Sequence, residues 1–350
     1  MNVRERVLAT LSWMEVDYVP WVVKANHLPR GEWERELRNK GLGFSLPASV
    51  YNVSMPNVAV SRVVKGDYFF RVYETPVGSL REVVKTGLPS EAGERSDRWV
   101  VEHLVKDSRD YRVLEYLFED MVFKPRYRDF RLIEEAVGGD GVVYTSIGYS
   151  PLMELIVNYM GFRVFAREFK RNPGKLESLL EIIHERKLEA CKLVANSPAK
   201  IVLIGDNIDE VLVDPRLFRK YCLPYYREYA DILKSSGKIV GSHMDGRLKS
   251  LKNLIAETGL DFIHGFTPPP GGNLSLREAR EAWKSVLWVN IPQVIFYENA
   301  SKIANYVRKL LEESGKRGLI LGITETVPPE ERRKGYTVIL EIVLKYGRVN

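Results

Sequence analysis

The sequence predicts a single α/β domain over residues 1–350, a (β/α)8 TIM barrel with an extra β-hairpin in its N-terminal half. Three observations predict this fold. Short apolar runs of strand length alternate with longer stretches that have helical periodicity. Eight such runs can be counted, and eight parallel strands close a barrel. No internal repeat or linker divides the chain into two units.

The predicted barrel strands are apolar without the alternation of a sheet that faces water, which is typical of parallel strands buried on both faces. In chain order they span residues 19–23, 48–53, 142–146, 201–205, 238–242, 261–265, 286–290 and 318–322. The run at 48–53 is the weakest of the eight. A doubly wound sheet also alternates strands and helices, but the glycines at 138–141 and 265–272 do not have the Gly-x-Gly-x-x-Gly spacing of its phosphate-binding turn.

Helical periodicity fills the intervals between these strands, and several of the stretches begin with proline or end before glycine. The predicted helices span residues 3–12, 151–160, 173–194, 215–235, 247–257, 276–283, 300–313 and 329–346. An additional hairpin is expected at about 67–86, because 67–75 and 79–85 alternate polar and apolar residues around Pro76, Val77 and Gly78. We expect it outside the barrel, with a helix at 109–120 beside it.

Composition narrows the classes of protein. Apolar residues make up 45% and charged residues 28% of the chain, and the net charge of +6 is spread without a sustained basic block, so no nucleic-acid partner is expected.

No apolar run approaches the length of a membrane span, and the first residues do not resemble a signal peptide. Cys191 and Cys222 have no close partner in sequence and are predicted to be buried packing residues in a cytoplasmic protein. Gln293 is the only glutamine, which is typical of heat-adapted proteins.

Polar residues follow the predicted strands at the end of the barrel where chemistry takes place in this fold. Burying such groups without partners costs several kcal/mol, so their convergence favours a site. We predict Asp206, His243 and Asp245 as catalytic residues. Substrate-binding residues are predicted to be Asn26, His27, Tyr149, Asn207 and Asn290. For any single residue, above all Asp206 and Asp245, the alternative is that it caps a helix or satisfies a loop. His103 and His184 are assigned no role.

Several motifs, in this order along nearly the whole chain, resemble the uroporphyrinogen decarboxylase superfamily. They are RERVL at 4–8, DYVP at 17–20, ETPVG at 74–78, GDN at 205–207, HMDG at 243–246, ETGLD at 257–261, TPPPGGN at 267–273 and VPP at 327–329. The resemblance implies the same barrel. It also implies one of two activities, which are decarboxylation of uroporphyrinogen without a cofactor and methyl transfer to or from a corrinoid, usually with zinc.

The two activities differ in their motifs. Decarboxylases of this family carry Arg-Gln-Ala-Gly-Arg-Tyr after the first strand, but this chain reads KANHLPR at 24–30, where Arg30 remains as one carboxylate contact. Methyltransferases hold zinc with His-x-Cys after the fifth strand and another Cys after the eighth. Here His243-x-Asp245 and the neighbourhood of Glu325 stand in those places, and the sequence leaves open whether Glu325 or Thr324 is the third ligand.

The resemblance therefore predicts a corrinoid-dependent methyltransferase that acts on a small methylated substrate, with a corrinoid protein as partner. His243, Asp245 and Glu325 are its predicted ligands for Zn²⁺ or another divalent metal. Three alternatives stay open: porphyrinogen decarboxylation, a metal-free enzyme in which His243 and Asp245 transfer protons, and a binding protein that has kept only the barrel. The sequence does not decide whether the chain forms a homodimer.

Overall fold

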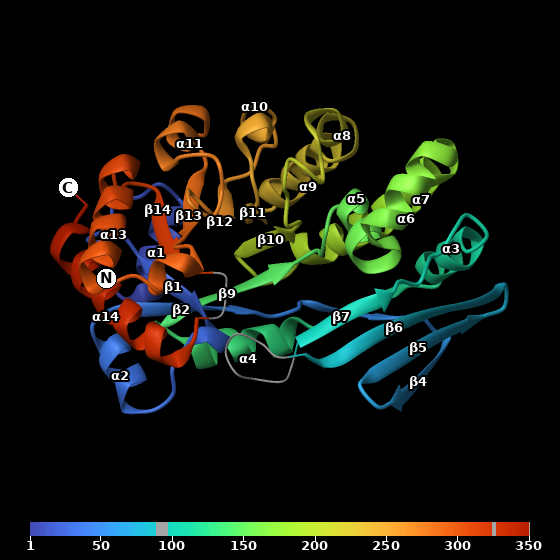
Figure 1. The fold of residues 1–350 in the computed structure, drawn as a ribbon, viewed down its shortest axis with the longest axis horizontal. Coiled ribbons are helices and arrows are strands. Elements are labelled where there is room, and N and C mark those ends of the chain that lie inside the picture. The colour runs from blue at the N-terminus through green and yellow to red at the C-terminus, as the bar shows by residue number, and fades with distance from the viewer. Residues whose placement is uncertain (89–96, 324–326, 350) are drawn as a thin grey trace.

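A computed structural model describes residues 1–88, 97–323 and 327–349. Within these residues eight parallel strands close into a barrel, so the predicted fold class is confirmed (Figure 1). Around the barrel the strands follow the order β1-β14-β13-β12-β11-β10-β9-β2. Their bounds are β1 (Trp21–Lys24), β2 (Leu42–Pro47), β9 (Gly141–Ser146), β10 (Ile201–Gly205), β11 (Ile239–His243), β12 (Phe262–Phe266), β13 (Val286–Asn290) and β14 (Leu319–Gly322).

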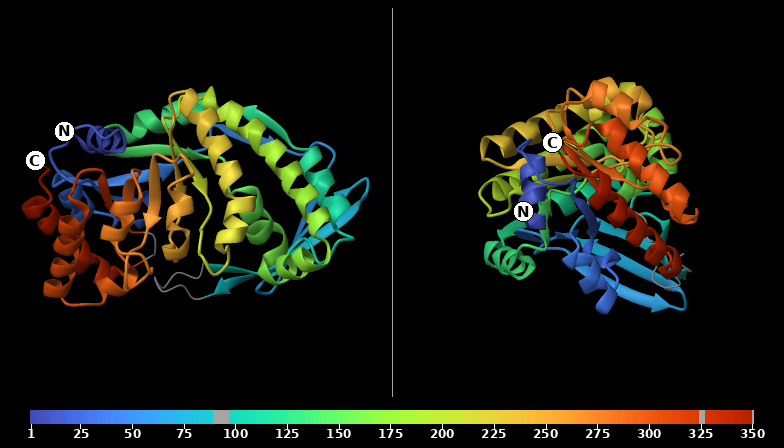
Figure 2. Two further views of the ribbon diagram at one scale, coloured as in Figure 1. Left: turned by 90° about the horizontal axis from the view of Figure 1, so that it is seen from above. Right: turned by 90° about the vertical axis from the view of Figure 1, so that its left-hand side faces the viewer.

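Helices surround the barrel on its outer side, as Figures 1 and 2 show. They are α1 (Val3–Leu11), η1 (Ala25–His27), α2 (Glu32–Asn39), α4 (Tyr127–Val137), α5 (Pro151–Glu154), η2 (Leu155–Met160), α6 (Gly161–Arg171), α7 (Pro173–Ala195), α8 (Pro215–Tyr221), α9 (Leu223–Ser235), η3 (Lys249–Leu251), α10 (Lys252–Ile255), α11 (Leu276–Ala282), α12 (Gln293–Phe296), α13 (Ala300–Ser314) and α14 (Pro329–Tyr346). The N- and C-terminal segments lie side by side, because Val19 N donates a hydrogen bond of 2.8 Å to Gly347 O. None of the helices in the described residues is long and apolar enough to cross a membrane.

Two predicted helices are interrupted in the structure. The stretch 215–235 is divided into α8 and α9, because Pro224 in the first turn of α9 has no N–H to continue the hydrogen bonds of α8. The stretch 247–257 contains only the short helical turns η3 and α10. Both cysteines are buried and free, as predicted.

The second barrel strand is β2, so the prediction of a barrel strand at 48–53 is wrong. Leu42 and Gly43 are buried in the barrel, where β2 pairs with β1 and β9. A Cβ atom on Gly43 would lie 2.2 Å from Cγ1 of Val3, so the glycine leaves room for α1. The sequence of β2 mixes polar and apolar residues, so it lacks the apolar run expected of a buried strand. The apolar run at 48–53 lies partly in β3 (Tyr51–Ser54), outside the barrel.

The predicted hairpin is present and belongs to a larger sheet. It consists of β5 (Tyr68–Thr75) and β6 (Gly78–Leu88), which β4 (Ala59–Lys65) and β7 (Asp97–Glu102) extend to a four-stranded antiparallel sheet. β3 pairs with β8 (Val122–Pro125), and α3 (Tyr111–Glu119) lies in the position predicted for a helix. This insertion begins at the C-terminal end of β2 and extends away from the barrel, toward the lower right of Figure 1.

The N-terminal end of the barrel is filled with apolar side chains. Val22, Val142, Ile201, Phe262 and Ile320 cluster there with residues of α1. Because side chains alternate along a strand, the residue two positions after Phe262 also points into the barrel. That residue is His264, so polar groups begin where the apolar layer ends.

Candidate functional site

Two histidines and an aspartate are in contact at the C-terminal ends of β11 and β12. Nδ1 of His243 lies 2.7 Å from Nδ1 of His264. Nε2 of His243 lies 3.3 Å from Oδ2 of Asp245. The side chain of His243 is 13% exposed and that of Asp245 35%, so the pair is reachable from solvent. The structure therefore brings together two of the three predicted catalytic residues, and it adds His264 of β12, which is not among the predicted site residues.

The side-chain environments of the histidines and the aspartate determine their charges. Burial, then the electrostatic effects of His243 and Lys24, lower the pKa of His264 well below its usual value, so its ring is neutral. Burial acts to raise the pKa of Asp245, but the hydrogen bond and the electrostatic effect of His243 outweigh it and the pKa is lowered. The site thus holds a carboxylate, a solvent-reachable imidazole and a neutral imidazole in one chain of contacts.

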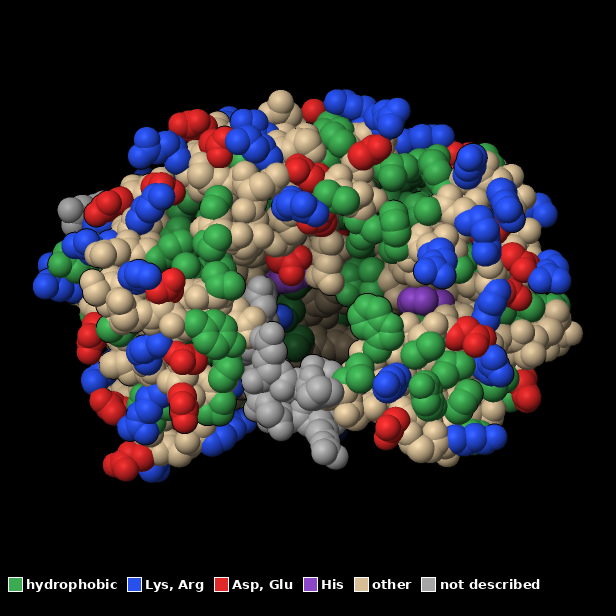
Figure 3. Space-filling view, viewed as in Figure 1, with side chains coloured by type: hydrophobic (Ala, Val, Ile, Leu, Met, Phe, Trp, Pro, Cys, Tyr) green, Lys and Arg blue, Asp and Glu red, His purple; other side chains and the backbone are tan. Residues whose placement is uncertain are grey.

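Lys24, the last residue of β1, brings a positive charge to this site. Its positive charge contributes to lowering the pKa values of both Asp245 and His264. Lys24 directly follows the apolar run 19–23 in the sequence, and this position is the signal by which the sequence can reveal it. Figure 3 shows a hollow near the centre of this face of the molecule, with histidine and acidic side-chain atoms in its wall.

Aromatic side chains line the inner side of His264. The Trp288 ring meets the imidazole edge to face, with ring centroids 5.0 Å apart, and Tyr144 lies on another side at 6.5 Å. Trp288 belongs to the apolar cluster at the N-terminal end of the barrel and Tyr144 packs against it, so His264 lies directly on this cluster and is 6% exposed. The neutral state of His264 follows from this burial.

Asp206 lies in a fully buried hydrogen-bond network. One carboxylate oxygen accepts from Ser150 N and the other from the Tyr226 hydroxyl. The Tyr226 hydroxyl also lies 3.1 Å from Oγ of Ser242, so the network links the end of β10 to α9 and β11. Burial raises the pKa of Asp206 despite these hydrogen bonds. In this arrangement both oxygens of Asp206 are engaged in supporting the strand ends.

The predicted substrate-binding residues lie in three different surroundings. Asn207 is exposed, has a φ of 47° and contacts the Tyr149 hydroxyl at 3.5 Å, so these two residues meet at the rim. Asn290 is buried and its Nδ2 donates to Gly265 O at 3.1 Å, which supports the strand beside His264.

In η1, Asn26 is exposed whereas His27 is 5% exposed and packs under α14, where its carbonyl accepts from the Tyr336 hydroxyl at 3.1 Å. Burial lowers the pKa of His27 to about 4, so its ring is neutral. The structure therefore places Asn26 at the surface and His27 in the interior, beside α14.

The predicted metal ligands are described in part. Glu325 and Thr324 lie outside the described residues, and in the described ranges no group of three or more His, Cys, Asp or Glu side chains is arranged to hold a metal ion. The remaining pair does fit one. Two ligands held about 2.1 Å from one tetrahedral ion are about 3.4 Å apart, close to the 3.3 Å between His243 Nε2 and Asp245 Oδ2. His264 would then form a hydrogen bond with Nδ1 of His243, the nitrogen that does not bind the metal. Metal-bound imidazoles usually have such a hydrogen bond.

Comparison with known proteins places these residues in a family. The uroporphyrinogen decarboxylase (URO-D) family model matches residues 98–346, more than half of the chain, and this range includes His243, Asp245 and His264. No curated protein matches the sequence.

Solved structures resemble the whole chain. A methyltransferase from Methanosarcina mazei has a TM-score of 0.60 at 15% identity, with 97% of this chain and 98% of that chain covered. A B12-independent methionine synthase from Shewanella sp. W3-18-1 has a TM-score of 0.46 at 11% identity, with 94% and 97% covered. At such identities the first likeness shows the barrel fold, which hosts many activities.

Proposed function

Because this chain belongs to the uroporphyrinogen decarboxylase family, we propose that it is an enzyme whose active site is formed by His243, Asp245 and His264 at the C-terminal ends of the barrel strands. The proposed reaction is transfer of a methyl group from a small oxygen- or nitrogen-bound donor to a corrinoid carried by a partner protein. The observation that carries the proposal is the contact chain Asp245–His243–His264, with distances of 3.3 and 2.7 Å.

His243 and Asp245 are the residues that would hold a divalent ion. When bound, the ion would polarise the oxygen or nitrogen that carries the methyl group, as a Lewis acid does. Carboxylate and imidazole ligands suit this task better than the thiolates that activate thiols, because they donate less electron density to the ion. The sequence of this chain, with Asp245 in place of a cysteine, therefore favours an oxygen or nitrogen donor.

His264 determines which nitrogen of His243 carries a proton. If Nδ1–H of His243 donates to the neutral His264, then Nε2 of His243 has its lone pair free for a metal. In the opposite tautomer Nδ1–H of His264 donates, and Nε2–H of His243 donates to Asp245. The same contacts thus serve a metal-bound and a metal-free site, and His264 is a positioning residue in both.

Lys24 would stabilise the leaving group. When the bond between methyl carbon and oxygen or nitrogen breaks, the electron pair stays on the heteroatom, which must take up a proton or lie near a positive charge. The charge of Lys24 already acts on Asp245 and His264. Tyr149 and Asn207 at the rim would orient the donor.

Porphyrinogen decarboxylation is less well supported. It requires arginines that hold several substrate carboxylates, and Arg30 is the residue left from that motif. The side chain of Arg30 is 81% exposed and lies 3.7 Å from Glu34 on the outer helix α2. It therefore faces solvent in the ion pair of a surface helix.

Elemental analysis of protein purified without chelator tests the metal. We expect about one divalent ion per chain, its loss in His243→Ala, and binding weakened about 10- to 100-fold in His264→Ala. His184→Gln is a matched control, because Nε2 of His184 lies 3.1 Å from Glu228 on the outer helices. Equal metal content in the wild type and in His243→Ala would exclude the proposed ligand.

The reaction is tested by adding cob(I)alamin with methoxylated aromatics, methylamines or methylthiols and following the absorbance change on methylation. Turnover with an oxygen or nitrogen donor, lost in His243→Ala and kept in His184→Gln, is expected. Coproporphyrinogen formed from uroporphyrinogen would establish the decarboxylase instead. Absence of both activities in metal-loaded protein would contradict the proposal.

A further inference from the structure

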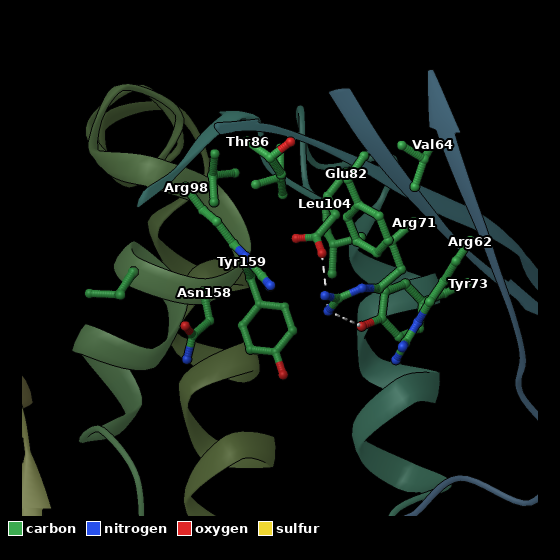
Figure 4. Close-up of a pocket in the computed structure, with 14 residues that line it drawn as sticks. Arg62, Val64, Arg71, Tyr73, Glu82, Thr86, Arg98, Leu104, Asn158 and Tyr159 are labelled. Carbon is green, nitrogen blue, oxygen red and sulfur yellow. Dashed lines mark hydrogen bonds and ion pairs between the residues drawn. The ribbon is translucent and has the colours of Figure 1, made fainter. Parts of the chain in front are cut away.

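A second cavity lies outside the barrel, between the four-stranded sheet and η2 (Figure 4). Its volume is about 690 Å³, within the range of small-molecule sites. Each strand of the sheet contributes to its wall, and residues 157–159 of η2 close the opposite side. The π-helical form of η2 is a feature often found at functional sites.

Arginines converge on this cavity. Arg62 of β4 lies directly opposite Arg71 of β5 in the strand register. Like charges directly opposite each other destabilise a sheet. Arg98 of β7 brings a third guanidinium to the same space, as Figure 4 shows. The sheet thus concentrates positive charge on the one face that looks into the cavity.

One carboxylate compensates part of this charge. Glu82 lies opposite Arg71 on the other side and pairs with it at 3.1 Å, and the carboxylate is buried. Among the described residues that line the cavity, Glu82 is the one acidic side chain. The lining therefore keeps a formal excess of two positive charges.

Arg71 also has an unused donor. Its Nη1 donates to the Tyr73 hydroxyl at 3.2 Å and pairs with Glu82. Its Nε is buried and has no hydrogen-bond partner within the described part of the chain. The Arg71 guanidinium also lies over the Phe69 ring, 5.4 Å from its centroid, so this nitrogen is enclosed by the protein and faces no ligand.

Apolar side chains flank the row of arginines. One residue of each strand forms an apolar row that lies in register, two residues along the strands from the pair Arg62–Arg71. The row consists of Val64, Phe69, Val84 and Val100. Leu104 and Val157 also line the cavity. An occupant would therefore meet guanidinium groups on one part of its surface and hydrocarbon on the rest.

We propose that this cavity binds a small ligand with at least two negative charges, as phosphate or carboxylate groups, next to a flat apolar body. The fork of a guanidinium donates two parallel hydrogen bonds to either group. Arg62 and Arg98 supply the uncompensated charge, and Phe69 with the valines contacts the apolar body. The site is independent of the reaction in the barrel.

Calorimetric titration with 1-naphthyl phosphate and with naphthalene-1,8-dicarboxylate tests the proposal, and the tighter of the two assigns the anionic group. We expect one probe per chain and weaker binding at higher salt. Arg62→Gln and Arg98→Gln should each weaken binding roughly tenfold or more. Both side chains are exposed, so the variants should fold, and an unchanged melting temperature checks this.

Two controls complete the experiment. Arg216→Gln removes the same charge from a side chain that is 94% exposed on α8, and it should leave binding unchanged. His243→Ala should also leave it unchanged, because that residue lies in the barrel. The proposal is overturned if neither probe binds, or if both cavity variants bind as tightly as the wild type.

Discussion

The imidazole ring of His243 occupies the space beside Gly265 where a side chain at that position would lie. A Cβ atom on Gly265 would lie 2.5 Å from Cε1 of His243. Gly265 also has a φ of 76°, a conformation that other residues rarely adopt. Its carbonyl accepts the hydrogen bond from Asn290. The glycine therefore permits the contact of His243 with His264.

Gly265→Ala should displace His243. The added methyl group meets the ring and strains the backbone, so we expect the free energy of unfolding to fall by about 1–3 kcal/mol. Urea denaturation measures the change. Gly205→Ala at the end of β10 is the control, since its Cβ would have no atom within 4 Å, and a change under about 0.5 kcal/mol is expected. Equal losses in both variants would contradict the steric explanation.

His27 should make the protein sensitive to acid. Burial, then Lys24 and Arg332, lower its pKa to about 4 in the folded state, whereas an unfolded histidine titrates near 6.5. Between these values the unfolded state binds more protons, so the contribution of His27 is complete above about pH 6.5 and is lost as pH falls toward 4.

Between pH 7.5 and 4 the free energy of unfolding should therefore fall less in His27→Gln than in the wild type. The expected difference is up to about 3 kcal/mol. Urea unfolding at a series of pH values measures the difference. Parallel curves for the two proteins would show that His27 is not kept neutral by the fold.

Lys187 and Glu154 form an ion pair of 3.0 Å behind the barrel mouth, with side chains only 10% and 13% exposed. Lys187→Met removes the positive partner of this carboxylate, which keeps the hydrogen bond from Asn158, so we expect a loss of about 3 kcal/mol in unfolding free energy. The double variant with Glu154→Gln should lose less than the sum of the single variants. The control pair Lys302–Glu298, 64% and 43% exposed, should contribute under about 1 kcal/mol. Similar coupling in both pairs would contradict this role of burial.

Part of the site can be read from the sequence. The spacing His243-x-Asp245 predicts two neighbouring side chains at a strand end, and the structure places them 3.3 Å apart. His264 has a weaker signal, its position two residues after the buried Phe262. The engagement of Asp206 by Tyr226 has no signal, because the tyrosine lies on a helix whose rotation against β10 is decided by packing.

The sequence by itself determined the barrel, seven of its eight strands and the end at which polar residues gather, because hydrophobic periodicity and helix termini are local properties of the chain. Only the tertiary structure decided that β2 is the second strand, that the hairpin belongs to a four-stranded sheet, that His264 meets His243 and that Arg62 lies opposite Arg71. Each of these depends on the register between segments distant in sequence, and register is set by how side chains pack together rather than by the residues of either segment alone.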